Sequence, residues 1–216
     1  MRRRLSEYRL FFKEFLANYH TTGAILPSGR PLARALARFV AEQPTGPRRI
    51  LEVGPGTGAV TSRIVPALTP EDQLDLVELN DSFVERLRDR FRNDPAFQPV
   101  ADRVRVMHCR IEDLPGDDTY DLIISGLPLN NFSVVDVKRI LARLTDLLKT
   151  GGTLSFFEYI AIRRARALLS GRAERARLRG IGQAMRAVLS KHEIRCDWIW
   201  PNVPPAWVHH VRVQTP

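Results

Sequence analysis

An apolar segment followed by three closely spaced glycines places the tightest constraint on the fold of this chain. Residues 50–60 read ILEVGPGTGAV, with glycines at positions 54, 56 and 58. Glycine accepts positive φ angles and leaves room for a ligand beside the backbone, so this pattern predicts a strand, a tight turn and a helix around a nucleoside. The unpaired N–H groups at the start of that helix suit an anionic group such as a carboxylate.

An acidic residue at the end of the next predicted strand supports this interpretation. Glu78 lies 24 residues after Gly54, at the end of the apolar segment LDLVE. In a second parallel strand, its carboxylate would lie against ribose hydroxyls. The two signals together predict a cofactor that contains a nucleoside.

The identity of the nucleoside depends on the residues between the glycines. Gly54, Gly56 and Ala59 also satisfy the dinucleotide fingerprint G-x-G-x-x-G/A. However, Pro55 has no N–H to donate to a pyrophosphate, and the negative charge of Glu52 would repel one. A carboxylate at this position attracts a cationic ammonium or sulfonium instead. The pattern E-x-G-x-G-x-G, which starts at Glu52, resembles motif I of the class I S-adenosylmethionine methyltransferases.

Composition is typical of one soluble globular protein. The chain has 216 residues, of which 44% are hydrophobic and 26% charged. It has no apolar run of the roughly 20 residues that a membrane span needs, and the basic amino terminus lacks the apolar core of a signal peptide. We therefore expect a cytoplasmic protein. Cys109 and Cys196 are predicted to be reduced thiols, and the spacing of the cysteines and histidines predicts no metal site.

The formal net charge of +9 is unevenly distributed along the chain. The excess of basic side chains lies in residues 1–49 and 163–195, whereas the central part of the chain is acidic. Such segregation indicates a polyanionic partner, either nucleic acid or an anionic membrane surface. For the Arg-rich segment within residues 163–195, the alternative to a polyanionic partner is a helix face exposed to solvent.

The amino-terminal segment predicts a basic amphipathic helix. Apolar and aromatic residues recur at helical spacing between Leu5 and Tyr19, flanked by Arg2, Arg3, Arg4, Arg9 and Lys13. Such a helix either lies in the interface of an anionic membrane or packs on the core. The sequence leaves both alternatives open.

Strand and helix signals alternate along the rest of the chain. After a helical run at 32–40, the pattern predicts strands at 49–53, 73–78, 103–108, 119–125 and 153–158, and helices at 59–68, 81–92 and 134–149. Arg-rich helices at 161–190 and strands at 194–200 and 207–213 follow. This alternation predicts an α/β fold with a mostly parallel sheet. The resemblance to class I methyltransferases implies a Rossmann-like sheet of seven strands with helices on both faces and an amphipathic helix at the amino terminus. We expect residues 1–48 to form a helical extension that faces membrane or substrate, and residues 49–216 to form the S-adenosylmethionine-dependent methyltransferase domain.

Ligands of such sheets bind outside the carboxyl ends of the strands. We therefore expect Glu52, Glu78, the residues after His108 and residues 125–128 to converge. Ile111 and Glu112 would border the adenine. Methyltransferases usually have Gly-Asp just before this point, where this chain has Cys109 and Arg110, so Glu112 or Asp113 would replace the lost carboxylate.

Several further segments resemble one family. TTGAILPSGRPLARALARFV, VELN, SGLPLNNF and IWPNVPPAWVHHVR, read together with LEVGPGTGAVT, resemble the bacterial phospholipid N-methyltransferases over residues 8–213. Members methylate phosphatidylethanolamine stepwise toward phosphatidylcholine and attach to the membrane through an amphipathic helix. The resemblance implies S-adenosylmethionine as cofactor, S-adenosylhomocysteine as product, a phospholipid substrate, and peripheral attachment to the anionic inner face of the cell membrane without a stable protein partner.

The resemblance also implies the site residues. Cofactor contacts are expected from Gly23, Glu52, Gly54, Gly56, Gly58, Glu78, Leu79, Asn80, Ile111, Glu112, Ser125, Leu127 and Pro128. The acceptor amine must lose a proton, and the candidate catalytic residues for this step are Tyr19, His20, Glu158 and Tyr159.

Two other functions fit part of the pattern. RNA adenine N6-methyltransferases share the glycine motif, but their fourth-strand loop carries an aromatic residue of the N-L-P-Y type. This chain has Leu129 at that position, with Phe132 nearby, and lacks their helical carboxyl-terminal domain. Nucleic acid is therefore the less expected partner. A non-catalytic membrane module that binds S-adenosylmethionine is the other alternative.

Overall fold

The computed structural model describes residues 29–42, 46–117, 119–159, 171–202 and 204–213. Its sheet has seven strands in the order β3-β2-β1-β4-β5-β7-β6. Six of them are parallel to one another, and β7 runs antiparallel to its neighbours β5 and β6. The predicted fold class is confirmed. The strands are β1 (Arg49–Val53), β2 (Gln73–Glu78), β3 (Val104–His108), β4 (Tyr120–Ser125), β5 (Leu148–Tyr159), β6 (Glu193–Ile199) and β7 (Ala206–Arg212).

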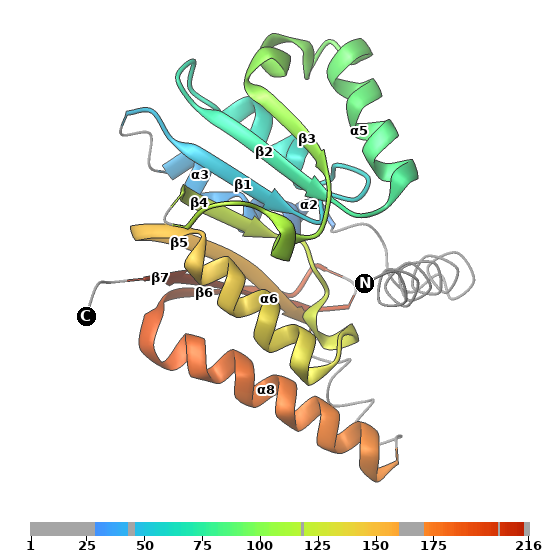
Figure 1. Cartoon of the computed structure of the whole chain (residues 1–216), viewed down its shortest axis with the longest axis vertical. Coiled ribbons are helices and arrows are strands. Elements are labelled where there is room, and N and C mark those ends of the chain that lie inside the picture. The colour runs from blue at the N-terminus through green and yellow to red at the C-terminus, as the bar shows by residue number, and fades with distance from the viewer. Residues whose placement is uncertain (1–28, 43–45, 118, 160–170, 203, 214–216) are drawn as a thin grey trace.

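Helices cover both faces of the sheet (Figure 1). They are α2 (Arg30–Leu36), α3 (Arg38–Glu42), α4 (Thr61–Ile64), α5 (Asp81–Asn93), α6 (Val134–Asp146) and α8 (Arg172–His192). Short 3-10 segments are η1 (Val65–Ala67), η2 (Gln98–Arg103), η3 (Ile111–Asp113) and η4 (Leu129–Asn131). One apolar cluster joins α2, α3, α4 and α5 to the sheet, and a second joins α6 and α8 to the other face.

Two helices are shorter than predicted. The helix expected at 59–68 is α4 followed by η1, because Pro66 lacks the N–H that would continue an α-helix. The helix expected at 134–149 ends at Asp146, because Leu148 already pairs with Tyr120 of β4 and starts a longer β5. Of the Arg-rich helices expected at 161–190, α8 is described from Arg172, and residues 160–170 lie outside the described part.

The strand order creates a topological switch point between β1 and β4. The chain proceeds from β1 outward to β2 and β3, and then returns to place β4 on the other side of β1. The connections that leave β1 and β4 therefore run to opposite sides and leave a crevice at their carboxyl ends. Ligands of open α/β sheets bind in such a crevice.

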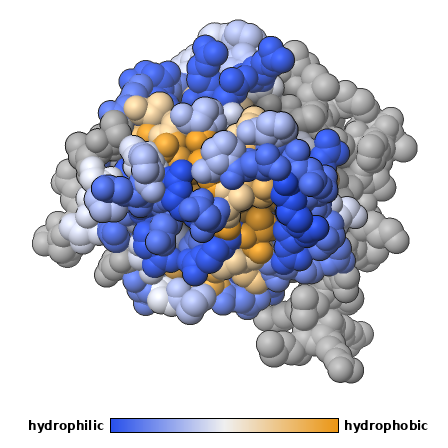
Figure 2. Space-filling model, turned by 90° about the horizontal axis from the view of Figure 1, so that it is seen from above, coloured by the Kyte–Doolittle hydropathy of each residue, from blue (hydrophilic) through white to orange (hydrophobic). Residues whose placement is uncertain are grey.

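The surface viewed from the β3 side is mostly hydrophilic, with a band of apolar residues between the charged ones (Figure 2). Apolar atoms normally contribute much of the surface of a folded protein, so this band alone indicates no function. Within the described residues, no helix is both long and apolar enough to cross a bilayer.

A buried ion pair holds the amino ends of β1 and β2 in register. The guanidinium of Arg48 donates to both carboxylate oxygens of Asp72, at 3.0 and 2.6 Å, and the Arg48 backbone N–H donates to Oδ1. Asp72 is fully buried. Burial raises the pKa of Asp72, but the hydrogen bonds from Arg48 and Thr69 outweigh it and hold this pKa below its ordinary value.

Asp72→Asn is expected to lower the free energy of unfolding by about 3 kcal/mol at neutral pH, because it removes the carboxylate charge that faces the buried Arg48 guanidinium. Urea denaturation measures this difference. The pKa of Asp72 is lower in the folded state than in the unfolded state. Its contribution to the free energy of unfolding is therefore present at pH values above the unfolded-state pKa, and it is lost as the pH falls through the folded-state pKa. The difference between parent and variant should therefore shrink in acid.

Asp102→Asn is the matched control, because Asp102 is 79% exposed and its ion pair with Arg103 spans 3.7 Å. A change of less than about 1 kcal/mol is expected there. Equal effects of the two substitutions would contradict a special role of the buried pair.

Candidate functional site

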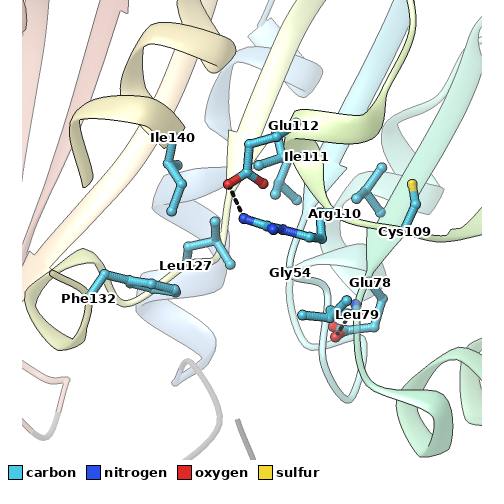
Figure 3. Close-up of a pocket in the computed structure, with 12 residues that line it drawn as sticks. Gly54, Glu78, Leu79, Cys109, Arg110, Ile111, Glu112, Leu127, Phe132 and Ile140 are labelled. Atoms are coloured by element: carbon cyan, nitrogen blue, oxygen red, sulfur yellow. Dashed lines mark hydrogen bonds and ion pairs between the residues drawn. The ribbon is translucent and has the colours of Figure 1, made fainter. Parts of the chain in front are cut away.

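A pocket opens at the carboxyl ends of β1, β2 and β4, where the switch point lies (Figure 3). Its walls come from the loops after these strands, from the segment after β3 and from α6. The lining residues are Val53, Gly54, Val77, Glu78, Leu79, Cys109, Arg110, Ile111, Glu112, Leu127, Phe132 and Ile140. Six residues predicted to bind the cofactor are among them: Gly54, Glu78, Leu79, Ile111, Glu112 and Leu127.

The backbone of two loops meets at the floor of the pocket. Gly54 N donates to Val77 O at 2.9 Å, and Gly126 N donates to Val53 O at 2.8 Å. Gly54 has a φ of +70°, which L side chains rarely adopt. A Cβ on Gly126 would lie 2.7 Å from Gly54 O. Glycine is therefore required at both positions for the loops to approach this closely.

Glu78 is positioned by three backbone N–H groups. Gly56 N donates to Oε2 at 3.0 Å, while Leu79 N and Asn80 N donate to Oε1 at 2.8 and 2.9 Å. Burial raises the pKa of Glu78, and these hydrogen bonds oppose the increase. The Asn80 side chain caps α5, since its Oδ1 accepts from Phe83 N. The carboxylate predicted to bind ribose is therefore held at the pocket wall.

Glu52 lies fully buried beneath the glycine turn. Thr61 Oγ1 donates to its Oε2 at 2.8 Å, whereas Oε1 is buried and makes no hydrogen bond with the described residues. Burial raises the pKa of Glu52 to about 8, and the nearby Glu78 charge adds to this increase. A cationic group nearby would stabilise the ionised form of this carboxyl group and offset the free energy that its burial costs.

The segment after β3 departs from the usual methyltransferase pattern. The guanidinium of Arg110 donates to Glu112 Oε1 at 2.7 Å across the upper part of the pocket (Figure 3). Glu112, predicted to replace the missing carboxylate, is thus already paired in the ligand-free protein. The planar guanidinium of Arg110 has the shape to stack on a flat ring.

An apolar wall closes the opposite side of the pocket. Leu127, Phe132 and Ile140 line it, and Leu127 and Phe132 are almost completely buried. Ser125 is buried behind this wall, where its hydroxyl accepts a long hydrogen bond of 3.4 Å from Leu127 N. Pro128 precedes η4, so it shapes the loop without lining the pocket.

The remaining predicted residues lie elsewhere. Gly58 O accepts from Arg90 of α5 at 3.3 Å, so this glycine faces the helix. Glu158 and Tyr159 end β5 at the same edge of the sheet and are buried, but neither lines the pocket. Tyr19, His20 and Gly23 lie outside the described residues. The lining residues that were not predicted to contact the cofactor are Val53, Val77, Cys109, Arg110, Phe132 and Ile140. Val53 and Val77 were recognisable as apolar residues near strand ends.

Comparison with known proteins agrees with this geometry. Residues 50–152 match the family described as "Methyltransferase domain". This part of the chain is therefore similar to methyltransferase domains. The same fold occurs in 1,6-didemethyltoxoflavin-N1-methyltransferase from Burkholderia thailandensis, which has a TM-score of 0.63 and 17% identity and covers 97% of this chain and 90% of that one. It also occurs in the O-methyltransferase TomG from Streptomyces achromogenes, with a TM-score of 0.61, 17% identity and coverage of 97% and 89%.

Two curated relatives are similar in sequence to this chain. Ornithine lipid N-methyltransferase from Singulisphaera acidiphila is 28% identical over 152 residues, which cover 70% of this chain and 77% of the relative. Ubiquinone/menaquinone biosynthesis C-methyltransferase UbiE from Marinomonas sp. is 32% identical over 111 residues, 51% of this chain. That alignment spans only 42% of UbiE.

S-Adenosylmethionine is the cofactor that these matches indicate. Both solved structures contain S-adenosylmethionine or S-adenosylhomocysteine. The pocket wall offers the Glu78 carboxylate for a ribose, while Glu52 lies buried beneath the glycine turn and does not line the pocket. The side-chain-free surface of Gly54 leaves space for the ligand beside the backbone.

The affinity for S-adenosylmethionine is expected to rise with pH, by up to about tenfold per unit between about pH 6 and pH 8. Glu52 is protonated below its pKa of about 8 in the free protein, and a cationic ligand favours its ionised form. Titration calorimetry at several pH values measures this dependence. Glu52→Gln should flatten it, and an unchanged pH profile in this variant would remove Glu52 from cofactor binding.

Gly126→Ala is expected to reduce methyl transfer at least about tenfold, because its Cβ would lie 2.7 Å from Gly54 O and force the two loops apart. Gly171→Ala is the matched control, since a Cβ there meets no atom within 4 Å. Single-turnover assays compare the two, with circular dichroism to check folding. Full activity of a folded Gly126→Ala protein would show that the close approach is unnecessary.

Proposed function

We propose that this protein is a peripheral membrane enzyme that transfers methyl groups from S-adenosylmethionine to the amine of phosphatidylethanolamine, toward phosphatidylcholine. The observation that carries the proposal is a contact between the two segments with the strongest family resemblance. Gly29 N, in the PSGRP segment, donates to Asn202 Oδ1 at 3.1 Å, in the PNVPPAW segment, 173 residues away.

This contact lies beside the cofactor edge of the sheet. Asn202 is buried in the loop between β6 and β7, and its Nδ2 donates to Pro204 O at 2.7 Å. A Cβ on Gly29 would lie 2.7 Å from Asn202 Oδ1, so the two loops pack without a gap. Since β6 is parallel to β5, this loop follows the carboxyl end of β6, at the sheet edge that holds the pocket. The two segments are thus in a position to shape the entry for the acceptor.

The similarity to ornithine lipid N-methyltransferase supports an amine on a lipid as acceptor. It also makes ornithine lipid a second candidate substrate. Both acceptors present an amino group on a lipid, so the same chemistry serves either. Their headgroups differ in charge and shape, and the loops around Gly29 and Asn202 would discriminate between them.

The residues of this chain must align the amine, exclude water and accept a proton. S-Adenosylmethionine supplies an electrophilic methyl group on its sulfonium. Leu127 and Phe132 provide the apolar wall that keeps water away. Tyr19, His20, Glu158 and Tyr159 remain our candidate proton acceptors, of which Glu158 and Tyr159 lie buried at the end of β5.

Membrane attachment is part of the proposal. The basic amphipathic pattern of residues 1–19 suits an anionic bilayer interface. Trp198 and Trp200, which are 58% and 62% exposed, lie at the carboxyl end of β6, and tryptophan favours the membrane–water interface. Both features would bring the pocket edge toward the inner face of the cell membrane.

The proposal predicts label in methylated lipid when the protein is incubated with radiolabelled S-adenosylmethionine and vesicles of phosphatidylethanolamine mixed with anionic lipid. Thin-layer separation of the lipids shows how many methyl groups are added. Parallel reactions contain ornithine lipid in place of phosphatidylethanolamine, or ribosomal RNA without lipid. The Gly126→Ala protein controls for contaminating methyltransferases.

Label in ornithine lipid alone would retain lipid N-methylation and replace the headgroup. Label in RNA alone would overturn the proposal and favour an adenine N6-methyltransferase. Absence of label from all three acceptors, in a protein that binds S-adenosylmethionine, would also overturn it and favour a different amine or a non-catalytic module.

A further inference from the structure

A second group of chemically reactive side chains lies on the outer strands β6 and β7. Glu193, Cys196 and His209 each direct one potential ligand atom into a common space, and these atoms lie within 4.8 Å of one another. Strands β4, β5 and β7 separate β6 from β1 in the sheet, so this group is distinct from the cofactor pocket.

An irregularity in β6 brings the three side chains together. Glu193 pairs with Val211 and Arg195 pairs with His210, so two steps along β6 correspond to one step along β7. In a regular strand, residues three apart point to opposite faces. The extra residue changes this alternation, so that Glu193 and Cys196 both approach His209.

His209 is the buried member of the group. Its Nδ1 is 2.7 Å from Glu193 Oε1, and its ring packs near Phe156 and Trp207, with centroid separations of 5.4 and 6.4 Å. The other ring nitrogen, Nε2, is buried and makes no hydrogen bond with the described residues. A buried nitrogen without a partner costs free energy in an apolar environment.

The environment of the thiol favours a cation. The negative charges of Glu193, Asp197 and Glu158 all act on the Cys196 thiol. Asp197 is also paired with Arg38 and Arg195, and Glu193 with His209. A divalent cation would reverse this repulsion and stabilise the thiolate.

We propose that Glu193, Cys196 and His209 bind one zinc ion, with water in the fourth position. A sulfur, a nitrogen and an oxygen ligand together suit Zn²⁺, whereas Mg²⁺ and Ca²⁺ prefer oxygen alone. Ligand atoms around one zinc ion lie up to about 4 Å apart, so small rotations of the exposed Glu193 and Cys196 side chains complete the site. The Cys196 thiol releases its proton to solvent as the Zn–S bond forms.

The ion would attach the edge strand to its neighbour. β6 contributes two ligands and pairs only with β7 in the sheet, so a metal that links Cys196 to His209 adds a cross-link between them. A ligand that binds only the folded state stabilises it by mass action. We therefore expect the thermal unfolding midpoint to rise with zinc concentration.

The test uses the full, untagged chain after treatment with a chelator. Titration with Zn²⁺ should show one ion per chain, and Co²⁺ should produce the near-ultraviolet charge-transfer absorption of a thiolate ligand. Cys196→Ser should abolish this absorption, weaken zinc binding at least about tenfold and remove the thermal stabilisation. Because all three tryptophans of the chain, at 198, 200 and 207, lie on these strands or just after β6, Co²⁺ should also quench the intrinsic fluorescence.

Cys109→Ser is the matched control, because the chain has only one other cysteine and it lies in the cofactor pocket. This variant should keep the zinc affinity and the cobalt absorption of the parent. Glu193→Gln, at an exposed position, should weaken zinc binding without unfolding. Absence of stoichiometric zinc binding by the parent, or cobalt absorption that survives in a folded Cys196→Ser protein, would overturn the proposal.

Discussion

The close approach of two loop backbones at the switch point is the constraint on which the rest of the site depends. Gly126 N donates to Val53 O and Gly54 N to Val77 O, which ties together the carboxyl ends of β4, β1 and β2. A side chain at position 126 would separate these ends, because its Cβ would lie 2.7 Å from Gly54 O. At position 54 the φ of +70° favours glycine. The two glycines therefore allow the backbones to approach closely beside the pocket.

Two buried carboxyl groups then give this pocket its chemical character. Glu78 satisfies its oxygens with three backbone N–H groups, whereas Glu52 retains one oxygen without a partner. Burial raises the pKa of both groups. Glu78 lines the pocket wall, whereas Glu52 lies buried outside the lining.

The proposed acceptor side of the molecule is built from segments far apart in the sequence. The amino end of α2 and the loop between β6 and β7 meet through Gly29 and Asn202, and the exposed Trp198 and Trp200 lie near the same sheet edge. In the proposed lipid methyltransferase, cofactor, acceptor and membrane would therefore meet at one edge of the sheet. The proposed zinc site lies on the same outer strands and would stiffen them without contacting the cofactor.

The sequence by itself determined the α/β alternation, the glycine turn and the two acidic strand ends, because these features are local and follow from periodicity and backbone geometry. It predicted six lining residues of the pocket through the family resemblance and the rule that ligands bind at the carboxyl ends of parallel strands. Only the tertiary structure decided that Glu52 is sealed beneath the turn, that Arg110 pairs with Glu112, and that Ile140 of α6 completes the wall. It also decided the meeting of Glu193, Cys196 and His209, because strand pairing and a single extra residue in β6 set which face each side chain occupies.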